Sequence, residues 1–475
     1  MTVQAPDRVR AATVSVTSQL AAKVLHLVLN LVSSLAIVRY LAPDSYGTYV
    51  LVLTVVTFAG VVADFGLPKL AVREMVRAGA DESGVAGTII ALRLGLAVVA
   101  IAGCQGVVAL LGGSPVAHVA AAIASLTILT EAVLGVLVVP FQTRVAQQNE
   151  AVLRVVAEAL ETGLILLLIA RGASLPWLFV PPAVGLAVAL VLAAALTRRR
   201  YGLRPRVVRA SIRPYLTEAV LLGPALLVGV LYLKLDSLVV AALRPPRDLG
   251  VYGAAYQPIE YLFLATAVII NVLFPLLAHA WGAGESDRFL QIYRRGTELL
   301  VIMTGFVAVV TVVLAPALVA TAFGPAYDDA ATPLAVLALA LVVMTVNAWQ
   351  SLVLLAGGHQ RVVLRYNLVA LGVAVVLCVV LVLAVGPVGA AMSALAVGLF
   401  VLGASTRAVR DHMAARLDWR RLAHIGVAGV PTFALVAGLT AAGVPWVPVA
   451  GLALVGYLVV VTRLGFAGSI RAAIA

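Results

Sequence analysis

The chain has 475 residues, of which 63% are hydrophobic and only 11% are charged, and its net charge is +12. A folded protein in water must cover its surface with polar groups, and soluble domains contain about 25% charged residues. The composition therefore excludes a soluble enzyme, a disordered chain and a coiled coil. The apolar runs are continuous and do not alternate with polar residues, so they predict an all-α integral membrane protein rather than a barrel.

Fourteen apolar stretches are long enough to form membrane-spanning helices, and short segments rich in glycine, proline and serine separate many of them. In chain order we expect spans at residues 14–41, 46–63, 85–111, 116–139, 151–170, 176–196, 215–243, 252–278, 296–323, 332–356, 363–385, 388–406, 422–442 and 446–465.

The basic residues predict an orientation for these spans. Most of the 33 lysines and arginines lie in loops on the side of the N-terminal tail, whereas the opposite loops contain only Arg171, Arg244 and Arg247. Cytoplasmic loops of membrane proteins are enriched in Lys and Arg. We therefore expect both termini to be cytoplasmic.

The longest predicted cytoplasmic loop, residues 197–214, separates spans 1–6 from spans 7–12. The expected domains are 1–207, 208–413 and 414–475, with spans 13 and 14 in the last. The turns after spans 1 and 7 share a Gly-x-Tyr pattern, at residues 47–49 and 250–252, which indicates a weak repeat. The loop is rich in arginine but has no accompanying aromatic stacking residues, so contact with anionic lipid is favoured over nucleic-acid binding.

Span 1 carries a polar stripe in an otherwise apolar helix. Its members are three or four residues apart and therefore share one helical face: Gln19, Lys23, His26, Asn30 and Ser33. Even lenient scales assign a cost of about 2.5–3.5 kcal/mol to a charge at the bilayer centre, so such residues usually face protein or water. The stripe predicts the wall of a hydrated cavity, and hydrogen bonding between helices is the alternative.

Further polar and ionisable side chains lie within or at the ends of the other spans. They are Arg39 in span 1, Arg93 in span 3, Glu131 in span 4, Glu158 and Glu161 in span 5, Tyr232, Lys234 and Asp236 in span 7, and Tyr256, Glu260 and Asn271 in span 8. A neutralising pair such as Arg93 with Glu131 is the structural alternative to a functional role in spans 3 to 5. Arg39 lies near the end of its span, where its side chain can extend towards the interface.

Sequence motifs for catalysis and cofactor binding are absent. The chain has no Gly-x-x-x-x-Gly-Lys-Ser/Thr loop, no His-Glu-x-x-His and no Cys-x-x-Cys, and its six histidines show no metal-ligand spacing. We therefore expect no catalytic residues, no metal and no cofactor.

The segment 37–49, which contains Ala-Pro-Asp-Ser-Tyr-Gly-Thr-Tyr, resembles the first inter-helix turn of bacterial polysaccharide flippases. These proteins belong to the multidrug/oligosaccharidyl-lipid/polysaccharide exporter superfamily. Other segments resemble later parts of the same family, in the same order along about residues 10–370: 63–67 with Arg73 and Glu74, 235–236 with 249–256, 273–275, 323–327 and 356–359.

The resemblance implies two six-helix lobes in a V shape plus two extra C-terminal helices, with a central cavity between spans 1, 2, 7 and 8. It also implies alternating access and a glycan substrate on polyprenyl phosphate or pyrophosphate. The expected substrate-binding residues are Lys23, His26, Asn30, Arg39, Arg93, Lys234 and Tyr256. The expected ion-coupling carboxylates are Asp236, Glu260 and Glu131. Some relatives have several cavity arginines, and this chain departs from that pattern.

The resulting hypothesis is a non-enzymatic flippase in a bacterial plasma membrane that moves lipid-linked oligosaccharide outwards for surface polysaccharide synthesis. Its expected partners are the polyprenyl-linked glycan, membrane lipids and proteins of polysaccharide biosynthesis, without nucleic acid. Three alternatives remain: an ion-coupled multidrug or metabolite antiporter of the same superfamily, a membrane glycosyltransferase or polymerase, and a non-transporting scaffold.

Overall fold

The computed structural model describes residue 22 and residues 25–77, 79–144, 147–442 and 444–463. Within these ranges every regular element is a helix, as the apolar runs predict. The contacts divide the chain into two compact units, residues 1–234 and residues 235–475. The division falls inside a helix, α10 (Arg209–Leu243), and not in the loop that precedes it. The domain limits expected from the sequence stay a prediction.

The first unit begins, within the described residues, with the helix Leu25–Tyr40. It continues with α2 (Pro43–Asp64), α3 (Leu67–Met75), α4 (Glu82–Leu110), α5 (Pro115–Ala124), α6 (Leu126–Leu137), α7 (Val139–Thr143), α8 (Gln147–Ala170), the 3₁₀ helix η1 (Leu175–Phe179), α9 (Val180–Tyr201) and the first part of α10.

The core of the first unit is built mainly from α3, α4, α6 and α9. Small residues allow the helix backbones to approach closely, as expected where lipid removes the hydrophobic drive between helices. Gly185 of α9 lies against the backbone of Ala157 in α8, and a Cβ there would be 2.6 Å from the Ala157 carbonyl oxygen. Ala189 and Ala193 continue this α9 face and are almost fully buried.

The linker between α9 and α10 is held against the start of α4. The backbone N–H of Arg206 donates to the carbonyl of Ser83 at 2.9 Å. The N–H of Val208 donates to Thr88 Oγ1, also at 2.9 Å. These bonds satisfy backbone N–H groups of a segment that belongs to no helix or sheet and therefore forms no regular backbone hydrogen bonds. The linker is therefore an ordered part of the first unit.

The beginning of α10 is also tied to the first unit. Glu218 accepts charge-assisted hydrogen bonds from Arg73 of α3, one of them to Oε2 at 2.8 Å. Gly223 packs directly against the ring of Phe65, in the turn between α2 and α3. The first half of α10 is thus fixed to α3 and its neighbours by both charge and packing.

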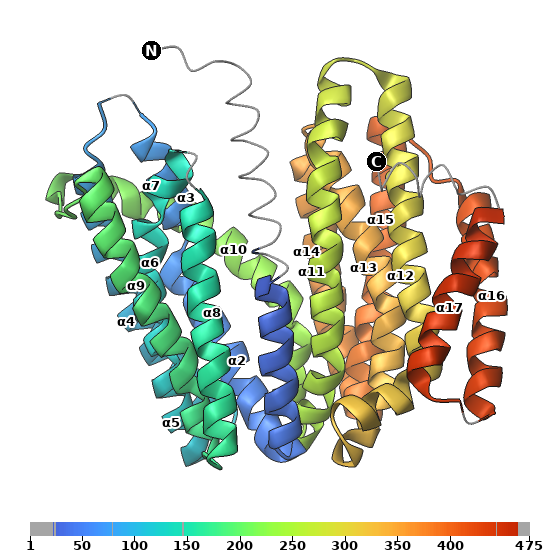
Figure 1. Cartoon of the computed structure of the whole chain (residues 1–475). Helices are drawn as coiled ribbons and strands as arrows, with labels where there is room; N and C mark the ends of the chain where they lie inside the picture. The colour runs from blue at the N-terminus through green and yellow to red at the C-terminus, as the bar shows by residue number, and fades with distance from the viewer. Residues whose placement is uncertain (1–21, 23–24, 78, 145–146, 443, 464–475) are drawn as a thin grey trace. The chain divides into compact units, whose positions relative to one another are not determined.

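The second unit contains the end of α10 followed by α11 (Pro246–Gly282), α12 (Ser286–Ala322), the 3₁₀ helix η2 (Pro325–Ala330), α13 (Ala331–Ala356), α14 (Gln360–Val385), α15 (Pro387–Met413), α16 (Trp419–Ala441) and α17 (Trp446–Val461). In each unit the helices run side by side (Figure 1).

The last two helices pack on α12. Tyr457 of α17 contacts Phe306 of α12, with ring centroids 5.5 Å apart. Val436 of α16 and Val449 and Ala453 of α17 are fully buried with Leu314 of α12 in a second cluster. The two helices therefore belong to the same compact unit as α11–α15.

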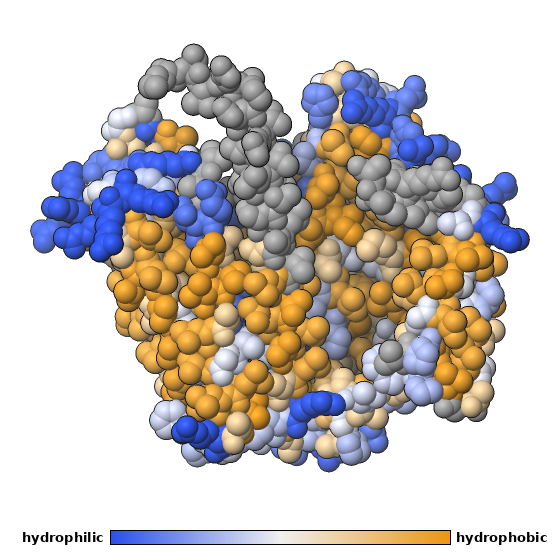
Figure 2. All heavy atoms as spheres, in the orientation of Figure 1, coloured by the Kyte–Doolittle hydropathy of each residue, from blue (hydrophilic) through white to orange (hydrophobic). Residues whose placement is uncertain are grey.

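Eleven helices in the described part of the chain are long and apolar enough to cross a membrane. All fourteen apolar stretches expected from the sequence coincide at least in part with helices, but Leu25–Tyr40 and Pro448–Val461 are shorter, and α8 carries four charged residues. Fourteen spans therefore stay a prediction. Figure 2 shows hydrophobic residues along the sides of the helices and hydrophilic residues concentrated towards their ends, as a multi-pass membrane protein requires.

Candidate functional site

The described part of the polar stripe of the first span, His26, Asn30 and Ser33, faces α8. Lys23 and Gln19 lie outside the described residues. Asn30 Nδ2 donates to Glu158 Oε1 at 2.5 Å, and His26 Nδ1 lies 3.2 Å from Glu158 Oε2. One turn further, the Ser33 and Thr162 hydroxyls share a hydrogen bond of 2.8 Å. These are the interhelical hydrogen bonds that the sequence left as the alternative to a cavity.

A small pocket adjoins these hydrogen bonds. Its volume is about 60 Å³, which is room for about four to six waters at ~10–15 Å³ each. The polar residues that line it are His26, Glu150, Arg154, Glu158 and Glu161. It is too small for a sugar chain in this conformation and has room only for water or a small ion beside the carboxylates of α8.

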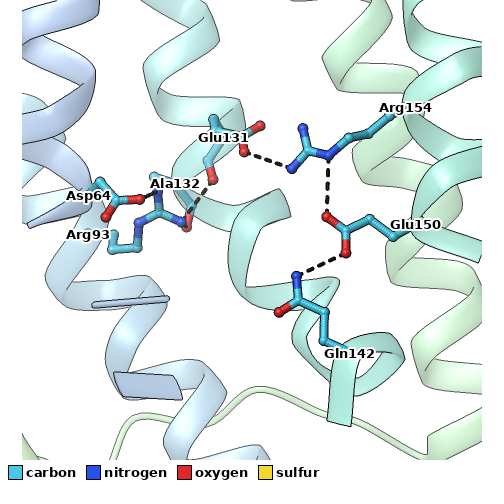
Figure 3. Close-up of polar contacts among 7 residues, drawn as sticks. All are labelled: Asp64, Arg93, Glu131, Ala132, Gln142, Glu150 and Arg154. Atoms are coloured by element: carbon cyan, nitrogen blue, oxygen red, sulfur yellow. Dashed lines mark hydrogen bonds and ion pairs between the residues drawn. The ribbon is translucent and has the colours of Figure 1, made fainter. Parts of the chain in front are cut away.

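A buried guanidinium connects three helices of the first unit. Arg93 of α4 is only 3% exposed, and its Nη1 donates to the backbone carbonyls of Glu131 and Ala132 in α6 at 3.0 and 3.2 Å. Its Nη2 pairs with Asp64 Oδ2, at the end of α2, at 3.3 Å. Figure 3 shows this side chain bridging the helices. A buried charge needs such partners.

The pair suggested by the sequence, Arg93 with the carboxylate of Glu131, is not formed. The Glu131 side chain instead pairs with Arg154 Nη2 of α8 at 3.4 Å. The physical reason is the glycine at position 135, which leaves space for the guanidinium against the α6 backbone. Arg93 therefore reaches the Glu131 carbonyl and not its carboxylate.

The polar contacts continue from Glu131 of α6 to residues of α8 and α7. Arg154 Nε also lies 3.3 Å from Glu150 Oε1, and Glu150 Oε2 accepts a hydrogen bond from Gln142 of α7 at 2.9 Å. Figure 3 shows this series of polar contacts from Asp64 at one end to Gln142 at the other. Five helices of the first unit are thus connected through polar groups. A network of this kind is expensive in lipid and marks a candidate functional region.

Sequence reasoning noted Glu158 and Glu161 but did not assign them to the site, and it omitted Glu150 and Arg154. A signal was present, because residues 150, 154 and 158 are four apart and 161 follows after three, which places them near one helical face. Through Glu158, this stripe on α8 contacts His26 and Asn30 in the stripe of the first span.

A second polar centre lies in the second unit. Tyr252 of α11 is fully buried, and its hydroxyl donates to Asp236 Oδ2 of α10. The Ser237 N–H donates to the other carboxylate oxygen at 2.7 Å. Tyr252 and Tyr256 are stacked, with ring centroids 5.8 Å apart. The sequence selected Asp236 and Tyr256 but used Tyr252 only as a repeat marker.

The remaining expected residues occupy different settings. Arg39 is exposed near the end of the first described helix, while Lys234 and Glu260 are partly buried. Lys234 is the last residue of the first unit, and Glu260 belongs to the second. Within the residues the structure describes, no group of three or more His, Cys, Asp or Glu side chains is arranged to hold a metal ion.

Comparison with known proteins supports the family resemblance. The family described as "Polysaccharide biosynthesis protein" matches residues 9–281, which is more than half of the chain, and the MatE family matches residues 225–380. No curated protein matches the chain.

Several solved structures share the fold. The structure described as "Lipid II flippase MurJ, inward closed conformation" has a TM-score of 0.76 and 11% identity, covering 94% of this chain and 98% of that chain. An inward-facing multidrug resistance MATE transporter of the MOP superfamily has a TM-score of 0.66 and 12% identity, with coverages of 84% and 99%. The Vibrio cholerae MATE transporter VcmN in its bent form has a TM-score of 0.53 and 14% identity, covering 85% of this chain and 99% of that chain.

The family match and the common fold agree with the order of the sequence segments noted above. The chain is a multi-pass membrane protein that belongs to the polysaccharide biosynthesis protein family and has the fold of the multidrug/oligosaccharidyl-lipid/polysaccharide exporter superfamily.

Proposed function

We propose that the protein is a flippase that moves oligosaccharide linked to polyprenyl phosphate or pyrophosphate across a bacterial plasma membrane for surface polysaccharide synthesis. The observation that carries this proposal is the family match over residues 9–281. The similarity of fold to a lipid II flippase supports a lipid-linked substrate. We place both termini in the cytoplasm because of the distribution of arginine and lysine.

The transport cycle in this proposal is alternating access. MATE transporters of the same fold have been solved in inward-facing and outward-facing conformations, with TM-scores of 0.66 and 0.56 to this chain. Substrate shifts such an equilibrium only if it binds the two conformations with different affinities. A lipid-linked anion can supply that difference through cations that are accessible in one state.

The polar groups divide into two proposed roles. Arg93 is buried and already held by Asp64 and two carbonyls, so we assign it to fixing α2, α4 and α6. Lys23, His26, Asn30, Arg39, Lys234 and Tyr256 remain the proposed contacts for the phosphate and sugar groups. Asp236, Glu260 and Glu131 remain the proposed carboxylates for coupling to an ion gradient.

Deletion of the gene followed by complementation tests the proposal. We expect the deletion strain to lose surface polysaccharide and to accumulate the lipid-linked glycan on the cytoplasmic leaflet. Glu158→Gln should complement poorly, because it weakens the acceptor for Asn30 and His26. Glu285→Gln removes the same charge from an exposed pair with Arg288 and should complement fully. Normal surface polysaccharide in the deletion strain would contradict the proposal.

A second candidate function is an ion-coupled multidrug or metabolite antiporter. The MatE family match at residues 225–380 and the MATE-like fold favour it. Growth of the deletion strain with cationic drugs separates the two functions. Increased drug sensitivity with unchanged surface polysaccharide would support the antiporter, whereas loss of polysaccharide with unchanged sensitivity would support the flippase.

A further inference from the structure

A charged groove lies in the second unit and shares no lining residue with the polar centre at Asp236 and Tyr252. It is formed by the last turns of α15, the short connection to α16 and the first residue of α16. Its volume is about 630 Å³, which is within the ~300–1,000 Å³ typical of small-molecule sites. Its lining residues are Gly403, Thr406, Arg407, Arg410, Arg416, Leu417 and Trp419. Three arginines and a tryptophan thus surround one open space, and no acidic side chain lines it.

The connection that shapes the groove is a defined structure. Ala414 adopts the left-handed conformation, with φ 51° and ψ 20°, which ends α15 abruptly. Ala415 and Leu417 are buried, at 1% and 9% exposure, so the intervening Arg416 projects outwards on the exposed side. Asp418 then caps α16 by accepting from the Arg421 N–H at 3.1 Å.

The arginines retain donors for a ligand. The side chain of Asp411 is shared, with Oδ1 3.0 Å from Arg410 Nε and Oδ2 3.7 Å from Arg407 Nε. Each guanidinium has five N–H donors, and these ion pairs use only Nε. Arg416 has no hydrogen bond or ion pair with any residue in the described part of the chain. The groove therefore has excess positive charge and unused forked donors, which suit the oxygen atoms of a phosphate group.

The groove lies where a lipid headgroup would be. The helix α15 has 27 residues and is therefore about 40 Å long at 1.5 Å per residue, compared with a hydrocarbon core of ~30 Å. The basic residues of its last turn, Arg410 and His412, favour placing this end of the helix in the headgroup region. Trp419, at 55% exposure, is of the residue type enriched at that interface. Thr406 and Gly403 extend the groove towards the apolar part of α15.

We propose that this groove binds the headgroup phosphate of an anionic membrane lipid. Arg407, Arg410 and Arg416 donate to the phosphate oxygens, and the Trp419 ring packs against the glycerol and upper acyl chain. The assignment does not depend on the transported substrate. It makes the junction of α15 and α16 a lipid-recognition site that includes none of the residues proposed to contact the transported substrate.

The test uses full-length protein in nanodiscs of phosphatidylcholine with increasing fractions of phosphatidylglycerol. Tryptophan quenching by brominated phosphatidylglycerol is compared with quenching by brominated phosphatidylcholine, and Trp419→Phe identifies the contribution of that ring. We expect Trp419 to be quenched selectively by the anionic lipid. Equal quenching by both lipids would overturn the proposal.

Arginine variants then test the source of selectivity. The measured ratio is quenching by brominated phosphatidylglycerol over quenching by brominated phosphatidylcholine. Each surface arginine is expected to contribute roughly fivefold to the preference for anionic lipid, so the triple variant Arg407→Gln/Arg410→Gln/Arg416→Gln should reduce that preference by roughly a hundredfold, to a ratio near that of an unselective surface. The matched control removes the same charge from the end of α9 with Arg198→Gln/Arg199→Gln/Arg200→Gln and should retain the ratio. An equal loss in the control would identify bulk electrostatics and overturn the site.

Two further measurements complete the test. Arg416→Gln alone breaks no hydrogen bond or ion pair among the described residues, so it tests the site if the triple variant does not fold. We expect it to reduce the ratio by roughly fivefold, and an unchanged ratio would refute its role. Inorganic phosphate, compared with chloride at equal ionic strength, should not displace the lipid. Displacement would identify a soluble-anion site and overturn the lipid assignment.

Discussion

The linker between α9 and α10 depends on the absence of a side chain at Gly87. A Cβ built on Gly87 would lie well inside 3.0 Å of three backbone atoms of Arg206. Because these are backbone atoms, no change of rotamer can relieve the contact. Gly87→Ala must therefore push the linker away from α4 and weaken the hydrogen bond between the Arg206 N–H and the Ser83 carbonyl.

The magnitude follows from two opposing effects. Overpacking of this kind costs about 1–3 kcal/mol, while Ala replaces Gly in a helix with a gain of about 0.5–1 kcal/mol. The central values of these two ranges, about 2 and about 0.75 kcal/mol, leave a net loss of local stability of about 1.25 kcal/mol. The population of the detached linker should therefore rise roughly eightfold. The effect is local because the linker is a peripheral segment.

Limited trypsin digestion measures this population directly. Arg206 lies in the linker and is followed by Val207, so it is a cleavage site, whereas Arg204 precedes a proline. With opening faster than cleavage, the rate tracks the open population. Gly95→Ala in the same helix is the matched control, since a Cβ there meets no atom within 4 Å. The reasoning is refuted if both variants are cleaved after Arg206 at the same rate.

Two other substitutions test the polar centres, and both are measured as thermal unfolding in detergent. Tyr252→Phe removes the buried hydroxyl that donates to the α10 carboxylate, and we expect a loss of about 1–3 kcal/mol in the free energy of unfolding. Tyr457→Phe is its control, because that hydroxyl forms no hydrogen bond in the described chain, and equal losses would contradict the assignment. Gly135→Ala places a Cβ 2.6 Å from Arg93 Nη1 and should cost about 1–3 kcal/mol. Gly163→Ala, in open space on α8, should cost nothing, and a stable Gly135→Ala protein would argue against a fixed guanidinium.

The helices could be located from the sequence because lipid imposes a simple rule on them. Long apolar runs bounded by turn formers must be helical, since no other open backbone conformation is satisfied in hydrocarbon. Shorter interruptions were not predictable in the same way. The fourth expected span is divided at Ser125 into α5 and α6, and the Ser125 hydroxyl bonds back to the Ala121 carbonyl. Such a bond depends on one rotamer and leaves little signal in a hydropathy pattern.

The candidate site was likewise predictable only in part. Periodicity correctly placed His26, Asn30 and Ser33 on one face of a helix. It did not identify α8 as the helix that this face contacts. Arg93 was recognised as a costly charge, but the carboxylate that pairs with it is that of Asp64 and not that of Glu131. Partner choice depends on helix rotation and on the space left by a glycine, and neither is encoded in spacing along one helix.

The composition of α8 has a consequence for biogenesis. Its charged residues are Glu150, Arg154, Glu158 and Glu161, and the translocon assigns a penalty of about 2.5–3.5 kcal/mol to an Arg or Asp at the centre of a nascent helix. A ribosome-bound chain ending after residue 170 would insert this segment poorly if it had to enter lipid alone. The partners of Glu158, Arg154 and Glu150 on other helices come from the first described helix, α6 and α7, all of which are synthesised earlier. Membrane integration of α8 would thus depend on the earlier helices still being next to the translocon when α8 is inserted.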